Sequence, residues 1–527
     1  MNKKLTLYVL ETLLKQRFSE GFLSLKDLPH PSTFKDMDKA TTRIVQAIKN
    51  REKITIIGDY DVDGVTSTTL MKLFFEEINY PIEWIIPNRF RDGYGLSSNI
   101  IPRIVDTDLA ITVDNGISAV YAAKLCKEED IELIITDHHL LAPEVPECFA
   151  IIDQKQESCN FPYSDVCGAQ IAWYLIASLK NALNITINML SYMELVAIAI
   201  IADMMPLQHI NRAMVEAGIK ALNKSSRPAI RAFMEDTQKE LINAEDIGFF
   251  LAPLLNSAGR MKDASYAVDF LASGNIYDAR IRLERLKEFN HLRKSTEQEI
   301  TLKAMGQVDR NDEVIVVGGE DWHEGVVGIV AARVARHHEK PCIVLSQNKE
   351  GLLKGSGRSF GECDLFGIVN GCREYLEKFG GHQAAIGLSM QTKSLKAFKE
   401  EIQKNFLLCG YSKELIDRDI VGELYFKDIS FDLTQLVKKY EPYGQGNPTP
   451  KFISTDVEIL QADSMGKEGE HLRFSLAQKG IVMAGVQFKT REMYEIGSKV
   501  DLIYTVNENH FRGRVTLQLM VEKIMLR

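Results

Sequence analysis

The sequence lacks the features of a zinc-ribbon, disulfide-rich or membrane-spanning protein. Its 8 cysteines form no C-x-x-C pair, so we expect free thiols in a reducing compartment. The longest apolar run, Leu195 to Ile201, is far too short to cross a bilayer. The N-terminal residues show no apolar segment or cleavage site of a secretory signal. These absences predict a cytoplasmic protein with no membrane partner.

The sequence also lacks an excess of positive charge, internal repeats and low-complexity tracts. A net charge of −9 excludes a uniformly basic nucleic-acid-binding surface, although it leaves room for a local basic groove. The chain has 527 residues, of which 45% are hydrophobic and 26% charged. A globular chain of this length predicts about three or four domains, each with its own core.

Strands and helices alternate from about residue 50 onward. Four short segments are β-branched and apolar on both faces, as buried parallel strands are: 53–59, 109–115, 131–139 and 148–154. Helical patterns separate them, for example in residues 117–130. This alternation predicts a doubly wound parallel sheet in an α/β domain.

The remainder of the chain divides into three parts. Residues 276–305 are charged, contain no Pro or Gly, and predict one long connecting helix. A second α/β pattern covers 306–408, and 415–527 are β-rich with polar turns, which predicts a small barrel. The fold class is therefore α/β, with two α/β lobes joined by a long helix and followed by a β-barrel.

Acidic and imidazole side chains follow the ends of the predicted strands. In open α/β sheets, ligands bind beyond these carboxyl ends. Aspartate is also a common turn and N-cap residue, which explains any one of these positions but not the whole set. Four separate segments contribute: Asp59, Asp61 and Asp63; Asp114; Asp137, His138 and His139; and Asp203.

This residue set predicts a metal site. Three carboxylates at alternate positions raise one another's pKa unless a cation lies among them. Oxygen-rich ligation with one or two imidazoles suits Mn²⁺ or Mg²⁺ better than zinc, and the number of carboxylates suits two ions. Two ions favour in-line hydrolysis of a phosphate ester. The residues alone leave the substrate open.

Four motifs, in this order, resemble the DHH phosphoesterase superfamily: "GDYDVDG", "TVDNG", "DHH" and "ADMMPL". The segments "LAPLLNSAGRMKDA", "GSGRS" and "GGHQAAIGL" are similar to its single-strand-specific exonuclease family. The resemblance implies a DHH domain with an N-terminal lead-in over 1–275, a DHH-associated domain over 306–408, and an OB-like nucleic-acid-binding domain over 415–527.

The resemblance also implies a division of the ligands between two ions. Asp61 and Asp114 would hold the first ion, and Asp114 would bridge to the second. His139 would face the scissile phosphate as an acid or an electrostatic stabiliser. The second ion would have four ligands: Asp63, Asp114, His138 and Asp203.

One position departs from the pattern of the superfamily. Many members have a histidine four residues before Asp61, where this chain has Ile57. Two alternatives follow: Asp59 supplies the missing ligand, or the first ion is bound more weakly.

Three further residues are candidates for binding substrate phosphates. Arg358 in "GSGRS" and His382 in "GGH" match phosphate-binding positions of the family, and an Arg fork among glycines suits phosphate. Arg260 is a third candidate. The alternative for Arg358 is an exposed side chain in a glycine-rich turn, and for Arg260 a capping or ion-pair role.

The resemblance implies a monomeric 5′→3′ exonuclease on single-stranded DNA that acts in repair and recombination, with a helicase and a single-strand-binding protein as possible partners. One alternative is a phosphodiesterase for short oligonucleotides or cyclic dinucleotides, but such relatives generally lack the barrel. Another is a non-catalytic replication scaffold, which would be expected to lose the Asp and His set.

Overall fold

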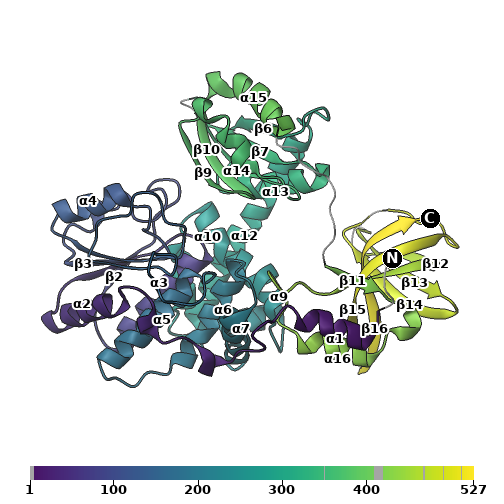
Figure 1. Cartoon of the computed structure of the whole chain (residues 1–527), viewed down its shortest axis with the longest axis horizontal. Helices are drawn as coiled ribbons and strands as arrows, with labels where there is room; N and C mark the ends of the chain where they lie inside the picture. Colours follow the sequence, from purple (N-terminus) through teal and green to yellow (C-terminus); the bar gives the residue numbers. More distant parts are fainter. Residues whose placement is uncertain (1–4, 349–350, 409–418, 467–468, 491, 512) are drawn as a thin grey trace.

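The computed structural model describes residues 5–348, 351–408, 419–466, 469–490, 492–511 and 513–527. Figure 1 shows three bodies: a first lobe in purple to teal, a smaller second lobe in green, and a yellow barrel. Helix α12 (Ile276–Met305) runs from the first lobe to the second, as the sequence predicted. The predicted fold class is confirmed. Among the described helices, none has the length and apolar character of a membrane span.

The first lobe is built on a parallel sheet with strand order β2-β1-β3-β4-β5. Its strands are β1 (Ile54–Ile57), β2 (Glu83–Ile85), β3 (Leu109–Val113), β4 (Glu132–Thr136) and β5 (Ala150–Ile152). The prediction missed β2, a three-residue strand at the edge of the sheet that is only partly buried.

Helices cover both faces of this sheet, because alternate residues of each strand enter different hydrophobic cores. Ile56 packs in the core that contains α2, α3, α5 and α6, whereas Ile57 packs in the core that contains α4. These helices are α2 (Met37–Asn50), α3 (Val62–Glu77), α4 (Val120–Glu128), α5 (Gly168–Ala182) and α6 (Met193–Ala202). The doubly wound arrangement is therefore confirmed.

A helical extension leads from this sheet to the connecting helix. It contains α7 (His209–Leu222), α8 (Pro228–Thr237), α9 (Ala244–Asp246), a π-helical turn (Ile247–Leu251), α10 (Ala252–Met261) and α11 (Ser265–Leu271). Helix α12 begins at the N-cap Asn275, whose Oδ1 accepts a hydrogen bond from the Asp278 amide at 3.0 Å.

The second lobe has a mixed sheet with strand order β6-β7-β8-β10-β9, in which only β6 and β7 run parallel among the described pairs. Its strands are β6 (Ile315–Glu320), β7 (Cys342–Gln347), β8 (Leu352–Arg358), β9 (Lys378–His382) and β10 (Ala385–Gln391). Its helices are α13 (Val327–His338), α14 (Leu365–Asn370) and α15 (Leu395–Leu408).

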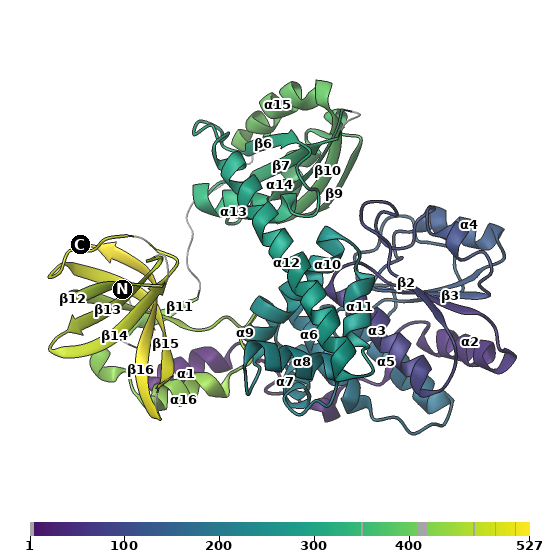
Figure 2. The same ribbon diagram turned by 180° about the vertical axis from the view of Figure 1, so that it is seen from behind.

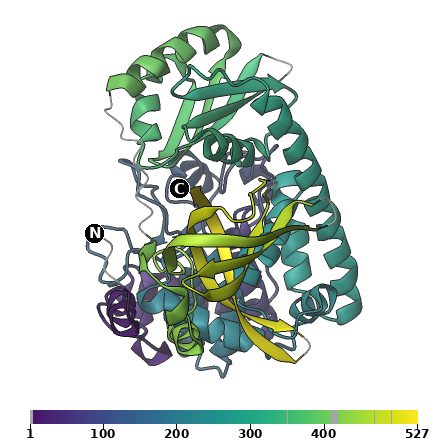
Figure 3. The same cartoon turned by 90° about the vertical axis from the view of Figure 1, so that its right-hand side faces the viewer.

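The C-terminal body is a barrel that closes through the pairing of β12 with β15. Its strands are β11 (Ile420–Glu423), β12 (Lys451–Met465), β13 (His471–Gln478), β14 (Ile481–Phe488), β15 (Lys499–Phe511) and β16 (Arg514–Leu526). Helix α16 (Phe431–Lys439) precedes β12. Figure 2 shows the barrel beside the first lobe with the second lobe above both, and Figure 3 views the molecule from the barrel side, so that the barrel lies in front of the first lobe.

The N-terminal helix α1 (Leu7–Lys15) packs against the barrel, although the sequence analysis grouped it with the first domain. Leu10, Leu14 and Phe18 are part of the barrel's hydrophobic core, and the Leu5 amide donates to the Glu423 carbonyl at 3.0 Å. Figure 1 shows α1 next to α16, far along the chain. The pattern of an amphipathic helix shows which of its faces is apolar but not which core that face enters.

Candidate metal centre

The turn after β1 brings three carboxylates to the carboxyl edge of the first sheet. Asp61 is the N-cap of α3, and its Oδ1 accepts a hydrogen bond from the Gly64 amide at 3.1 Å. A Cβ on Gly64 would lie 2.5 Å from the Asp59 amide nitrogen. Only glycine therefore allows α3 to begin against the strand end. Asp63, in the first turn of α3, points toward α5.

Asp63 is held by the N-terminus of α5. Its carboxylate accepts hydrogen bonds from the amides of Gly168 at 2.6 Å and Ala169 at 2.8 Å. The helix dipole favours a negative charge at this position. A Cβ on Gly168 would lie 2.5 Å from the Cβ of Asp114, so the glycine also lets α5 approach the end of β3.

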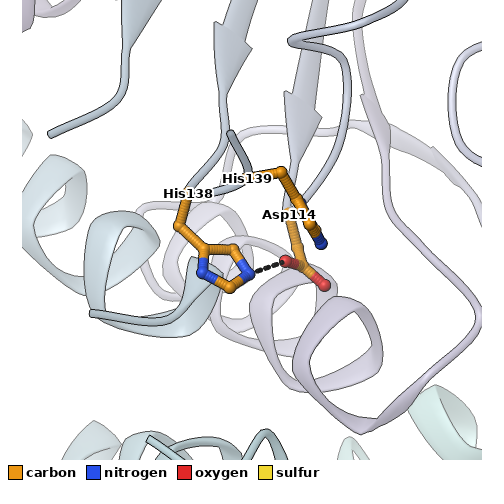
Figure 4. Close-up of side chains that lie close together, drawn as sticks. All are labelled: Asp114, His138 and His139. Carbon is orange, nitrogen blue, oxygen red and sulfur yellow. Dashed lines mark ion pairs between the residues drawn. The ribbon is translucent and has the colours of Figure 1, made fainter. Parts of the chain in front are cut away.

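His138 lies at the meeting point of carboxylates from three segments. Its Nε2 is 3.2 Å from Asp114 Oδ1 and 3.7 Å from an oxygen of both Asp63 and Asp203. Figure 4 shows the close pair of His138 and Asp114, with His139 alongside. Asp203 is the C-cap of helix α6, so this carboxylate comes from the end of a helix rather than of a strand.

The structure gathers the predicted ligands into overlapping sets. In each set of three residues, one ligand atom per residue lies within 4.8 Å of the others: Asp59, Asp61 and Asp114; Asp63, His138 and Asp203; and Asp114, His138 and His139. Ile57, which stands where many superfamily members have a histidine, packs in the hydrophobic core beside α4. Asp59 lies in the set with Asp61 and Asp114.

The donor atoms fit divalent cations. Asp59 Oδ1 and Asp203 Oδ2 are buried and have no hydrogen-bond partner among the described residues. Unpartnered buried carboxylate oxygens are costly unless something cationic satisfies them. Oxygen ligands with one imidazole match the preferences of Mg²⁺ and Mn²⁺.

Burial and mutual repulsion dominate the electrostatics of this centre. Burial and the Asp61 charge raise the pKa of Asp63 to about 6. Burial, Asp63 and Asp61 raise the pKa of Asp203 to about 8. Burial, followed by the charge of His139, lowers the pKa of His138 to about 3. His138 is therefore neutral near neutrality and keeps a lone pair for a metal.

These shifts predict that the metal-free protein loses stability as pH rises. The raised pKa values of Asp63 and Asp203 mean that the folded state binds more protons than the unfolded chain, whose carboxyls titrate near pKa 4. The free energy of unfolding should therefore fall between about pH 4 and pH 8. Saturating Mn²⁺ should restore about 2–3 kcal/mol, with the larger gain at the upper end.

Urea unfolding of chelator-treated protein, with and without added MnCl₂, measures this effect at the two ends of the pH range. An Asp203→Asn variant should show a shallower pH dependence without metal, because it lacks one of the shifted carboxyls. A manganese effect of equal size at both pH values would contradict the prediction.

His139 differs from His138 because Asp137 holds it. Its Nδ1 lies 2.7 Å from Asp137 Oδ1, and Asp137 Oδ2 accepts a hydrogen bond from the Ile117 amide at 2.9 Å. Burial lowers the pKa of His139, but the hydrogen bond and charge of Asp137 outweigh it and raise the pKa to about 9. His139 is therefore a cation, which makes it a poor metal ligand although it lies within reach.

Asp137, which the sequence offered only as one of the candidate metal ligands, instead binds His139, and Tyr94 was not among the candidates. Tyr94 Oη is 3.4 Å from His139 Nε2. Asp137 directly precedes the histidine pair, so its position offered a signal. Tyr94 lies in a loop far from the motifs, and only the folded chain brings it to the centre.

Arginines from both lobes gather beside the carboxylates. Burial, together with Arg89, Arg293 and Arg358, lowers the pKa of Arg260 to about 10, and the charge of Asp61 acts in the opposite direction. Arg260 Nη1 donates to the Gly325 carbonyl of the second lobe at 3.2 Å. Arg358 Nη1 donates to the Ser356 hydroxyl at 2.8 Å. Arg89 and Arg293 were not among the phosphate-binding candidates in the sequence.

His382 lies near Arg358 in the second sheet but is more exposed. Ala385 on β10 is directly opposite Arg358 on β8 and His382 on β9. Residues directly opposite one another share a face of the sheet, so the two side chains stand on the same face about 10 Å apart. Of the three predicted phosphate-binding residues, Arg260 and Arg358 lie close enough for their charges to interact. His382 lies two strands away from Arg358.

Three domain families match this chain. The DHH family N-terminal domain matches residues 53–200, the DHHA1 domain matches 311–407, and the RecJ OB domain matches 420–523. Fold and site together define the class of the protein as a phosphoesterase of the DHH type.

The particular family follows from the relatives that match over the whole length. The single-stranded-DNA-specific exonuclease RecJ of Escherichia coli is 32% identical, over 93% of this chain and 90% of the relative. A crystal structure of Thermus thermophilus RecJ with Mn²⁺ has a TM-score of 0.80 at 25% identity and covers 94% of this chain and 72% of that one. A structure of RecJ with Mg²⁺ from the same organism has a TM-score of 0.74 at 24% identity, over 94% and 70%. The chain belongs to the RecJ family of single-stranded-DNA-specific exonucleases.

Proposed function

We propose that this chain hydrolyses single-stranded DNA from the 5′ end with two Mn²⁺ or Mg²⁺ ions, in DNA repair and recombination. The observation that carries the proposal is the position of Asp114. It lies in one carboxylate set with Asp59 and Asp61 and also 3.2 Å from His138, a member of the set with Asp63 and Asp203.

This arrangement supports a specific division of ligands. Asp59, Asp61 and Asp114 would hold the first ion, with Asp59 in place of the histidine absent at position 57. The second ion would have four ligands: Asp63, Asp114, His138 and Asp203. When bound, the ions lower the pKa of a water molecule and neutralise charge on the phosphate.

His139 acts on the substrate rather than on a metal. Its imidazolium is fixed by Asp137 and lies beside the ligand set, with 47% of its side chain exposed. A positioned cation can donate a hydrogen bond to a phosphate oxygen and a proton to the leaving oxygen. Asp137 is a positioning residue, because it sets the orientation and charge of His139.

The arginine group binds the phosphates of the strand. Arg89, Arg260 and Arg358 converge from both lobes, and guanidinium groups match phosphate geometry. Such concentrated positive charge is unfavourable without an anion. His382, exposed on the same face as Arg358, is positioned for a neighbouring phosphate.

A crevice of about 1250 Å³ between the first lobe and the barrel supports a path for the rest of the strand. Met204, next to Asp203, lines one end, and Lys438, Lys439 and His510 line the barrel side. Basic side chains near apolar ones suit a single strand, whose phosphates would replace the carboxylates that pair with them here: Glu508 with Lys438 and His510, and Glu11 with Lys439. We further propose a monomer in the cytoplasm, where the described cysteines stay free, and a helicase and a single-strand-binding protein as partners.

End-labelled digestion tests this proposal. With Mn²⁺, single strands labelled at the 5′ end should lose their label as mononucleotide from the first turnovers, whereas 3′-labelled strands should shorten progressively. Blunt duplex of the same sequence should stay essentially intact. Release of the 3′ label first, equal digestion of duplex, or activity confined to di- and trinucleotides would contradict the proposal.

A further inference from the structure

The loop that opens the second lobe, Trp322 to Gly325, has a fixed conformation. The Trp322 side chain is buried, and its carbonyl accepts a hydrogen bond from the Ser346 hydroxyl. The Val326 amide donates to the His323 carbonyl at 3.0 Å. The first bond ties the loop to β7 and the second closes a turn at His323, so His323 has a defined backbone position.

The same loop fixes the tautomer of His323. The Gly325 amide donates to Nδ1 at 3.1 Å, so Nδ1 carries a lone pair and the proton of the neutral ring is on Nε2. Burial is the largest influence on His323 and lowers its pKa, which favours this neutral form. In the described part of the chain, no acceptor lies within hydrogen-bond distance of Nε2.

The imidazole faces the first lobe at the arginine group. Its ring meets that of Phe90 edge-to-face, with centroids 5.4 Å apart. Gly325 accepts the hydrogen bond from Arg260, and a Cβ on Gly325 would lie 2.0 Å from the Arg260 carbonyl and 3.1 Å from His323 Cε1. The absence of a side chain at Gly325 therefore lets the two lobes meet with His323 beside Arg260.

The Nε2–H of His323 is half-buried near arginine side chains and needs a hydrogen-bond acceptor. The acceptor that suits these surroundings is an anion. A cationic or metal ligand is excluded, because the lone pair of the ring is already used and the neighbours are positive. A phosphate oxygen held by Arg89 and Arg260 satisfies both the arginines and Nε2. The neighbouring carboxylate, that of Glu324, pairs with Lys354 at 3.2 Å.

From these contacts we propose that His323 is a substrate-binding residue, which donates its Nε2–H to a phosphate of the single strand held between the two lobes. The inference rests on the proposed function, since it assigns a further ligand to the same phosphate site. It also gives the second lobe a direct part in strand recognition besides Arg358 and His382.

Two substitutions separate this role from packing. His323→Asn keeps an acceptor near the position of Nδ1 for the Gly325 amide but removes the Nε2 donor. His323→Gln places an amide N–H near the position of Nε2. Loss of one hydrogen bond to a charged group should raise KM and Kd of the Asn variant about tenfold, with kcat nearly unchanged. The Gln variant should stay within about threefold of wild type.

Binding is measured by fluorescence anisotropy with a short 5′-phosphorylated oligodeoxynucleotide, labelled at its 3′ end, in Ca²⁺; KM and kcat are measured in Mn²⁺. His291→Asn, on the exposed face of α12, is the matched control and should behave as wild type. Wild-type KM and Kd in His323→Asn would overturn the proposal, as would equal losses in the Asn and Gln variants, which would indicate ring packing. Wild-type protein that binds strands without degrading them would contradict the proposed function, while the binding comparison still decides the role of His323.

Discussion

Asp114→Asn is expected to lower kcat on single-stranded DNA by roughly three orders of magnitude, equivalent to about 4 kcal/mol of transition-state stabilisation. Asp114 lies in one set of donor atoms with Asp59 and Asp61 and contacts His138 in the other. A neutral amide at this position weakens both proposed ion sites at once. Asparagine is the right replacement, because residue 114 has a φ of 63°, which Asn adopts more readily than Ala.

The fold of this variant should survive, and its stability separates a metal defect from misfolding. Burial and four neighbouring carboxylates raise the pKa of Asp114 well above its usual value, so its charge is destabilising without metal. The metal-free variant should therefore unfold at higher urea concentration than metal-free wild type near pH 8. Asp130→Asn, at an exposed residue that also has positive φ (57°), is the control and should be fully active. Substantial turnover in Asp114→Asn would refute the bridging role.

The second large effect concerns His139 and its partner. His139→Gln should lower kcat by about 10²- to 10⁴-fold with a small change in Mn²⁺ affinity, because the residue acts on the substrate and not as a ligand. Loss of metal affinity parallel to the loss of kcat would instead identify His139 as a ligand.

Asp137→Asn should change the pH profile of kcat in a defined direction. The raised pKa of His139, about 9, keeps the imidazolium form present below that value, and the charge is lost as pH rises through it. Without the Asp137 carboxylate the pKa should return toward about 6.5, so the alkaline limb of the profile should move to lower pH. Measurements with Mg²⁺ from about pH 5.5 to pH 10 cover the alkaline limb of both proteins.

Asp106→Asn provides a matched control for Asp137→Asn. Asp106 also pairs with a cationic side chain, Lys53, but on the surface. Its replacement should leave the profile unchanged, since exposed ion pairs contribute little. An unchanged alkaline limb in Asp137→Asn would show that another group sets it.

Much of this molecule could be predicted from local sequence. Strands that are buried on both faces, such as Ile54–Ile57, predict a parallel sheet covered by helices on both sides. A strand with one face in solvent would instead alternate apolar and polar residues. Helix α12 has the predicted bounds, because its 30 residues favour helix and include no Pro or Gly that would interrupt it. The order of the acidic motifs likewise predicted one edge of one sheet as the place where Asp59, Asp114 and His138 meet.

Other features arise from contacts between segments distant in sequence. The pairing of Arg260 with Gly325, the position of Tyr94 beside His139, and the packing of α1 on the barrel all join such segments. A periodic pattern states which face of an element is apolar, but not which other element covers it. By itself, therefore, the sequence determined the candidate metal ligands and three of the candidate phosphate-binding residues, Arg260, Arg358 and His382. Only the tertiary structure decided that His138 is neutral and His139 a cation, because burial lowers the pKa of His138 whereas the contact with Asp137 raises that of His139.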